Sequence, residues 1–212
     1  MAYEKRREAE KEALRQKVIE VAEGVFLNKE FDNISIDEIA DLAGITKRNM
    51  HRFFINKKDL FYAVMERILS FLMRMLKEQK EKETDPAKQL ETVLYQLFFN
   101  YYNKAEIFLL FNRFAMLKKQ TESAILPQRV SFLACSEQMR EAFTTVCQNG
   151  IDKGQFQTEL SAREAADLLI ASSFGLLAMH EVRVDKESDE HSKIEDSKKW
   201  ASFIVKGIGY QA

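Results

Sequence analysis

The sequence predicts an all-α protein, and three observations carry that prediction. The chain has 212 residues but only two prolines and seven glycines, so few positions interrupt a helix. Apolar residues recur three and four positions apart along most of the chain, which is the periodicity of amphipathic helices. No segment of useful strand length alternates apolar and polar residues. We therefore expect about nine helices around a sizeable core.

The N-terminal quarter predicts one long helix followed by two short ones. Apolar residues at helical spacing give a first helix over about residues 8–28. Ser35, with Glu38 three positions later, is a capping box that begins a second helix. Gly44 ends this helix, because glycine accepts the left-handed conformation found at helix ends. Thr46 then caps a third short helix.

Longer helices fill the rest of the chain. Asn56 caps the fourth helix, and Asp85 with Pro86 marks a clear restart at the fifth. The fourth to eighth helices are expected over about residues 57–82, 86–103, 104–118, 127–153 and 161–184. A ninth helix carries the apolar residues near the C-terminus.

One short segment is free of acids. Residues 44–58, GITKRNMHRFFINKK, contain five cations, Lys47, Arg48, Arg52, Lys57 and Lys58, whereas the whole chain has a net charge of -1. A nearly neutral chain has no global field that attracts nucleic acid, so any binding has to come from a local patch. Carboxylates in such a patch would repel the phosphate backbone of DNA, which accounts for their absence.

The second and third helices, with a glycine-centred turn between them, form a helix-turn-helix pattern. Ala40 is the small residue where the helices cross, and apolar positions face the core behind both helices. The remaining side chains of the third helix face outward and are of the types that reach base edges and phosphates. They are Thr46, Lys47, Arg48, Asn49, His51 and Arg52. The alternative is a solvated basic face on an ordinary helix.

Residues 31–68, FDNISIDEIADLAGITKRNMHRFFINKKDLFYAVMERI, resemble the DNA-binding domain of TetR-type bacterial transcriptional regulators. SIDEIADLAGIT matches the first block of the family pattern, and HRFFINKKDL matches the aromatic-rich second block. The resemblance implies a helix-turn-helix DNA-binding domain over residues 1–56 and a helical effector-binding and dimerisation domain over residues 57–212. It also implies DNA contacts by Ser35 and by Lys57, whose ammonium can hold a phosphate together with the helix N-terminus.

Two positions depart from the family pattern. Arg48 stands where many relatives have a small residue, and His51 stands where tyrosine is common. The histidine can still donate a hydrogen bond to a phosphate, with a pH dependence that tyrosine lacks. The extra long donor at Arg48 means that an operator sequence does not carry over from the family.

The C-terminal two thirds are rich in Phe and Met, which suit either core packing or an apolar ligand cavity between helices. The resemblance implies such a cavity. The candidate ligand-binding residues are Phe71, Met75, Phe98, Tyr102, Phe111, Arg113, Phe114 and Phe143, with Arg113 suited to an anionic head group. Packing of the last two helices of each subunit as a dimer interface, again implied by the family, gives Gly175, Trp200, Ile204 and Ile208 as candidate interface residues.

These features together predict a ligand-responsive, sequence-specific transcriptional repressor in the cytoplasm. We expect a homodimer that binds a pseudo-palindromic double-stranded DNA operator and is released by a small hydrophobic or aromatic effector. No cofactor, metal site or membrane contact is expected. The alternatives are a helical interaction module with a degenerate helix-turn-helix and a helical enzyme. Catalytic groupings, phosphate-binding glycine loops and metal-ligand spacings are missing from the sequence, which argues against the enzyme.

Overall fold

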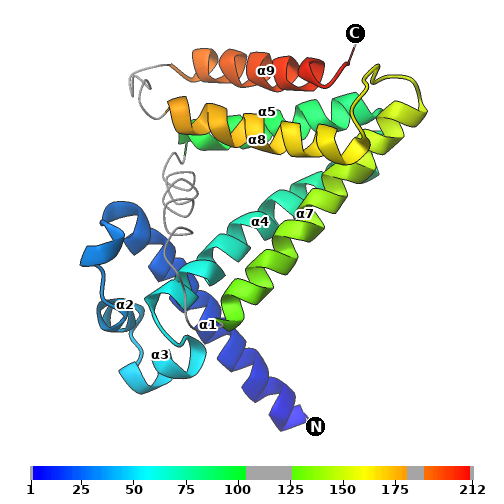
Figure 1. Ribbon diagram of the computed structural model, residues 1–212. Coiled ribbons are helices and arrows are strands. Elements are labelled where there is room, and N and C mark those ends of the chain that lie inside the picture. Colours follow the sequence, from blue (N-terminus) through cyan, green and yellow to red (C-terminus); the bar gives the residue numbers. More distant parts are fainter. Residues whose placement is uncertain (1, 104–125, 181–188, 211–212) are drawn as a thin grey trace. The chain divides into compact units, whose positions relative to one another are not determined.

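The computed structural model describes residues 2–103, 126–180 and 189–210, and most of these residues are helical (Figure 1). Their only β-structure is an isolated bridge between Phe156 and Tyr210, so the all-α prediction is confirmed. None of these helices is both long enough and apolar enough to cross a membrane. The helix expected at about residues 104–118 lies outside the described residues. The helices are α1 (Ala2–Asn28), the 3-10 helix η1 (Phe31–Asn33), α2 (Ile36–Ala43), α3 (Lys47–Phe53), α4 (Lys57–Lys82), α5 (Pro86–Asn103), α7 (Pro127–Asp152), α8 (Ala162–His180) and α9 (Glu190–Gly207).

The chain divides into two compact units. The first contains the residues up to Ile68 and the start of α7 as far as Ala134. The second begins at Leu69 and contains the remainder of α4 and α7 together with α5, α8 and α9. Both α4 and α7 therefore continue from one unit into the other. The division expected at residue 56 concerns function, and it stays a prediction.

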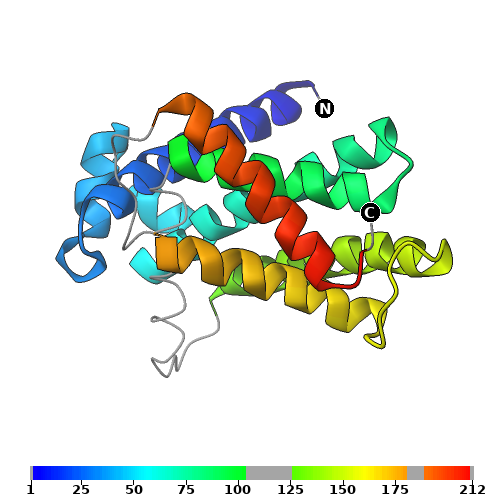
Figure 2. The ribbon, with the colours of Figure 1, turned by 90° about the horizontal axis from the view of Figure 1, so that it is seen from above.

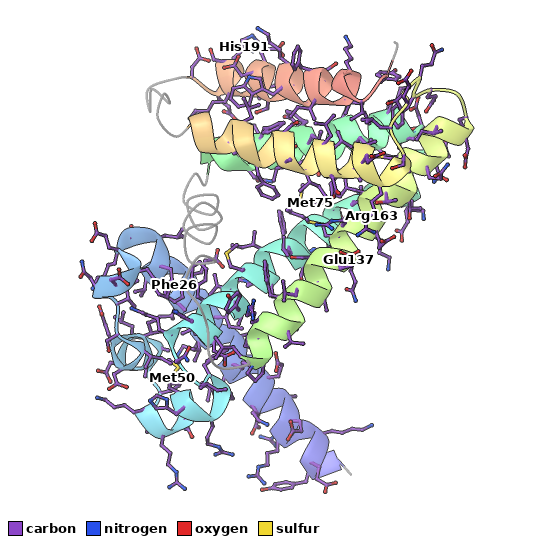
Figure 3. The ribbon with its side chains drawn as sticks, in the orientation of Figure 1. Phe26, Met50, Met75, Glu137, Arg163 and His191 are labelled. Atoms are coloured by element: carbon purple, nitrogen blue, oxygen red, sulfur yellow. The ribbon has the colours of Figure 1, made fainter. Side chains whose placement is uncertain are left out.

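Aromatic packing forms the core of the first unit. The ring of Phe26 in α1 lies 5.2 Å from the ring of Phe61 in α4, and Phe31 lies 5.7 and 5.4 Å from these two rings. Such pairs contribute about 0.5–1.5 kcal/mol each beyond the burial of their area. Met50 of α3 is fully buried on the inner side of the helix-turn-helix (Figure 3), as are Ile39, Ala40 and Ala43 of α2. The apolar positions of the pattern thus lie where α2 packs against α1 and α3 packs against α2.

Side-chain caps fix the ends of α2 and α3. The hydroxyl of Ser35 accepts hydrogen bonds from two backbone N–H groups of α2, at 3.1 and 3.3 Å. The hydroxyl of Thr46 accepts one from α3 at 3.2 Å. Gly44 has a φ of 69°, so it takes the left-handed conformation that ends α2. A hydrogen bond from Lys29 holds the carboxylate of Glu38 and lowers its pKa. Each N-cap contributes about 1 kcal/mol to the stability of its helix.

Asp59, the acid that follows the basic segment, is buried and ties the start of α4 to the start of α7. One carboxylate oxygen accepts from the N–H of Ile55 at 3.0 Å, and the other accepts from the N–H of Gln128 at 3.0 Å. The rings of Tyr62 and Phe132 add an apolar contact between the same helices, with 5.9 Å between centroids. Asp59 therefore serves as a structural cap, and its charge is kept off the exposed basic surface.

In the second unit α9 lies across α5 and α8 (Figure 2). Phe98 of α5 meets Trp200 of α9 edge-on, with 5.6 Å between centroids. On the surface, Arg163 of α8 donates to Glu137 of α7 at 2.6 Å and also to Glu141 (Figure 3). These hydrogen bonds lower the pKa of Glu137 and raise that of Arg163. Because the pairs are exposed, they fix how α7 meets α8 more than they stabilise the unit.

Candidate nucleic-acid interface and a groove in the second unit

The outward face of α3 carries two arginines. Arg48 and Arg52 are four positions apart, so they lie on one side of the helix, roughly opposite the buried Met50. Both are exposed, and neither forms an ion pair within the described part of the chain. A guanidinium that is not held by an acid is free to make the bidentate contacts by which arginine recognises guanine or phosphate.

An acid from α2 borders this face on one side. The ammonium of Lys47 donates to Asp37 at 2.7 Å, and Nε2 of His51 lies 3.9 Å from the same carboxylate. The hydrogen bond with Asp37 raises the pKa of Lys47. The acid-free segment therefore acquires a carboxylate neighbour through the packing of α2 against α3. Sequence reasoning confined to residues 44–58 missed this contact, because it depends on how the two helices cross.

On its other side α3 faces the N-terminal half of α1. Asn49 and Phe53 point this way, and together with Arg52 they line a cleft of about 420 Å³. The opposite wall is formed by residues of α1: Arg7, Glu8, Glu10, Lys11 and Leu14. The predicted DNA-contacting residues of α3 thus lie in three places. Arg48 and Arg52 face outward, Lys47 and His51 lie near Asp37, and Asn49 lies next to α1, where Arg52 also lines the cleft.

The remaining predicted DNA contacts lie at helix ends. Ser35 and Thr46 cap α2 and α3, and a hydroxyl that accepts a backbone hydrogen bond can still donate its own proton to a phosphate. Lys57 is held inside the chain instead. Its ammonium donates to the carbonyl oxygens of Phe31 and Ile34, the latter at 2.8 Å, and lies 4.4 Å from the centroid of the Phe31 ring. Burial lowers the pKa of Lys57.

The predicted ligand residues are only partly described. Phe98 is fully buried against Trp200, Met75 and Phe143 are buried, and Phe71 is 41% exposed. The others lie outside the described residues; they are the side chain of Tyr102 together with Phe111, Arg113 and Phe114.

A groove of about 410 Å³ lies between α4 and α7 within the second unit. Its lining includes three cations and no acid, and its floor contains the buried side chains of Leu76 and Val146. The lining residues are Met73, Arg74, Leu76, Lys77, Lys80, Ala142, Thr145 and Val146. None of the predicted ligand residues is among them. The available signal was the series Arg74, Lys77 and Lys80, three cations spaced three positions apart on α4.

Two of the four predicted dimer residues lie in the core of the chain itself. Ile204 and Ile208 are 8% and 1% exposed, so they are covered without a partner subunit. Trp200 packs on Phe98 but is only half-buried. Gly175 is exposed on α8. The large apolar side chain that α9 does expose is Phe203, at 77%.

Comparisons of the sequence with known proteins point to the same region of the chain. The family model for "Bacterial regulatory proteins, tetR family" matches residues 18–64, which run from the second half of α1 into α4. The HTH-type transcriptional regulator TtgR of Pseudomonas putida is 24% identical over 187 residues, which cover 82% of each chain.

Two solved structures share the fold. FadR of Bacillus subtilis in complex with stearoyl-CoA gives a TM-score of 0.70 at 17% identity, over 91% of this chain and 98% of that one. The fatty acid degradation regulator FadR of Bacillus halodurans gives 0.69 at 15% identity, over 93% and 97%. The described helix-turn-helix coincides with the region that the family model matches. Residues 18–64 therefore form a helix-turn-helix DNA-binding region of the tetR-family type, and the chain as a whole is similar to HTH-type transcriptional regulators such as TtgR.

Proposed function

We propose that the chain is a ligand-responsive repressor that binds a pseudo-palindromic operator as a homodimer and has no catalytic activity. The observation that carries this proposal is the outward face of α3, where Arg48 and Arg52 are exposed and are not held by an acid of the described chain. Direct readout of bases needs such free donors on a helix that can enter the major groove. The caps at Ser35 and Thr46 fix the starts of α2 and α3, which supports a defined position of α3 for presenting these donors.

The assignment of base reading to Arg48 can be tested with a duplex that the protein selects from a random pool. Arg48→Ala should weaken binding to that duplex by about 1–3 kcal/mol and relax the preference at one base pair per half-site. The measurement is fluorescence anisotropy against the selected duplex and against single-base-pair variants of each position. If Arg48→Ala keeps the wild-type preference at every position, Arg48 does not read bases.

A symmetric dimer is proposed because one short recognition helix gives little specificity, whereas two related by a two-fold axis read both halves of a palindrome. The exposed side of α8 and α9 supports such an interface. Leu168, Ala171 and Gly175 follow one another at helical spacing on α8, and Phe203 projects from α9. Exposed small residues on α8 and an exposed aromatic ring on α9 suit close approach of a second copy.

The proposed effector has an apolar tail and an anionic head. The α4–α7 groove supports this chemistry, since Leu76 and Val146 offer an apolar floor and Arg74 with Lys77 offers cations at its edge. Its volume is in the range of sites that hold small ligands. The solved relative from Bacillus subtilis contains stearoyl-CoA, a molecule of this chemical class. α4 also supports a route for induction, because the same helix begins beside α3 and continues to the groove.

Stearoyl-CoA is the probe for this part of the proposal, with coenzyme A alone as the control for the head group. Arg74→Ala combined with Lys77→Ala should reduce affinity for stearoyl-CoA at least tenfold, since two charge-assisted contacts are removed. Lys88→Ala with Lys199→Ala removes the same charge from exposed sites of the same unit and should leave that affinity unchanged. Isothermal titration calorimetry measures all three proteins. Equal affinities throughout would rule out the groove as the acyl-CoA site.

A further inference from the structure

The core-facing stripe of α1 continues beyond the core as a basic stripe. Val18 and Ala22 are fully buried, and the same helical face leads toward the N-terminus through Leu14, Lys11 and Arg7. The turns before Leu14 are exposed and project past the helices against which α1 packs (Figure 1). Arg7 and Lys11 therefore stand on the face of α1 that is turned toward α3. Cations at these positions suit an anionic partner that contacts both helices.

This basic stripe forms one wall of the cleft beside the recognition helix. Arg7 and Lys11 line the cleft from α1, and Arg52 lines it from α3, over an apolar floor of Leu14 and Phe53. Arg7, like Arg52, forms no ion pair with any residue that the structure describes. Two unengaged guanidinium groups and an ammonium therefore border one cleft.

Acids also line the cleft, but they lie toward its edges. At 100° per residue, Glu8 and Glu10 lie about 80° to either side of the stripe centred on Arg7 and Lys11. Arg6 holds Glu10 at 2.9 Å, and Glu8 lies 3.8 Å from Lys11. The centre of the stripe is cationic, and a flexible Lys11 can leave its long contact with Glu8 for a stronger anion.

We propose that the N-terminal half of α1 is a second DNA-contacting element, in which Arg7 and Lys11 act with Arg52 to hold the phosphate backbone beside the half-site that α3 reads. The proposal rests on DNA binding by α3. Asn49 and Arg52 belong both to that helix and to the cleft, so DNA seated on α3 brings its backbone next to α1. The exposed turns are about 18 Å long, enough for Arg7 and Lys11 to reach two neighbouring phosphates of one strand. Contacts of this kind add affinity and fix register without reading sequence.

The test compares two double variants of the full chain. Arg7→Ala with Lys11→Ala removes the stripe, whereas Lys5→Ala with Lys88→Ala removes the same charge from exposed positions that do not line the cleft. Binding to the selected duplex and to a scrambled duplex of equal length is measured by fluorescence anisotropy at salt concentrations from about 50 to about 200 mM KCl. Circular dichroism and thermal unfolding check that each variant is folded.

Log K falls as log salt rises, and the loss of two phosphate contacts should make this negative slope shallower by about 1.8. A fourfold rise in salt would then weaken the stripe variant about twelvefold less than the wild type. Selected and scrambled duplexes should lose affinity by the same factor, and the control variant should keep the wild-type slope. An unchanged slope in the stripe variant, or an equal change in the control, overturns the proposal. If Arg48→Ala still weakens the selected duplex in that case, DNA reading by α3 stands and only the role of α1 is lost.

Discussion

Asp37 is the residue that limits the basic surface of the helix-turn-helix. Its carboxylate holds Lys47 at 2.7 Å and lies 3.9 Å from His51, so it competes with DNA for both. The pair is exposed, so solvent screens it and its contribution to folding is small. The geometry therefore points to a restraint on DNA affinity more than to a contribution to stability.

Asp37→Asn should strengthen DNA binding. The change removes one anion from the protein–DNA interface and frees Lys47 for a phosphate, so the salt slope should become steeper by about 0.9 on selected and scrambled duplexes alike. Asp152→Asn, an exposed acid of α7 in the second unit, is the control and should have no effect. Weaker binding by Asp37→Asn would show that DNA needs Lys47 held in place by Asp37.

Lys57 presents two competing roles that one substitution separates. The resemblance implies a phosphate contact, whereas in the structure its ammonium bonds the carbonyl oxygens of Phe31 and Ile34. Lys57→Met keeps the aliphatic stem but removes these hydrogen bonds, so urea unfolding should show a loss of about 1–3 kcal/mol. The DNA salt slope should stay at the wild-type value. A salt slope that is shallower by about one, with an unchanged free energy of unfolding, would favour the phosphate contact of Lys57 instead.

At the scale of the element, helix boundaries follow from local chemistry. The ends of α2, α3, α4 and α5 agree with the sequence because each start has a capping residue, as at Ser35 or Asp85, and Gly44 ends α2. The start of α1 did not agree. The apolar pattern begins at Leu14, but the helix extends to Ala2 through a charged segment that periodicity does not mark.

The candidate site could be predicted from the sequence only where it depends on one helix. The outward positions of α3 follow from its own periodicity, and Arg48 and Arg52 lie there as expected. The contact of Asp37 with Lys47, the internal bonds of Lys57 and the α4–α7 groove all depend on how separate helices pack. Periodicity gives the face of a residue on its helix, but it does not give the partner that this face meets.

Two neighbouring residues of α9 allow the proposed dimer interface to be tested separately from the core of the single chain. Ile204 is 8% exposed and Phe203 is 77% exposed, although they are neighbours in the chain. Phe203→Glu should give a folded monomer, because a charge at an exposed site disrupts only an interface between subunits. Ile204→Glu should instead destabilise the chain by roughly 3 kcal/mol or more, since it buries an unpaired carboxylate.

Analytical ultracentrifugation with thermal unfolding separates these outcomes. The proposed dimer fails if the wild type sediments as a monomer at micromolar concentration. If Phe203→Glu remains dimeric, the exposed side of α8 and α9 is not the dimer interface. A Phe203→Glu variant that is unfolded would show that Phe203 supports the fold of the single chain.

At the scale of the whole molecule, induction is a coupling between two binding sites. Under the proposed function, stearoyl-CoA would release DNA only by as much as its affinity differs between the DNA-binding form and the released form of the protein. Linkage then requires the selected duplex to weaken stearoyl-CoA binding by the same factor. A hundredfold effect corresponds to about 2.7 kcal/mol of coupling.

Both directions of this cycle should be measured, with anisotropy for DNA and calorimetry for stearoyl-CoA. Equal factors in the two directions are expected. The Arg74→Ala with Lys77→Ala variant should bind DNA normally and respond only to higher concentrations of stearoyl-CoA. Release of DNA with no reciprocal loss of stearoyl-CoA affinity would indicate a detergent-like effect of the lipid, and it would contradict induction through a site on the protein.

The central claim is that α3 reads a DNA sequence, and the specificity ratio tests it most directly. This ratio compares the affinity of the wild type for its selected duplex with its affinity for a scrambled duplex at the same salt concentration. We predict a ratio of at least about 10³, as sequence-specific regulators show. Combined Arg48→Ala and Asn49→Ala should reduce that ratio at least tenfold while changing affinity for the scrambled duplex much less. A wild-type ratio near one, with strong salt dependence on both duplexes, would show that the basic face of α3 binds phosphate without reading bases.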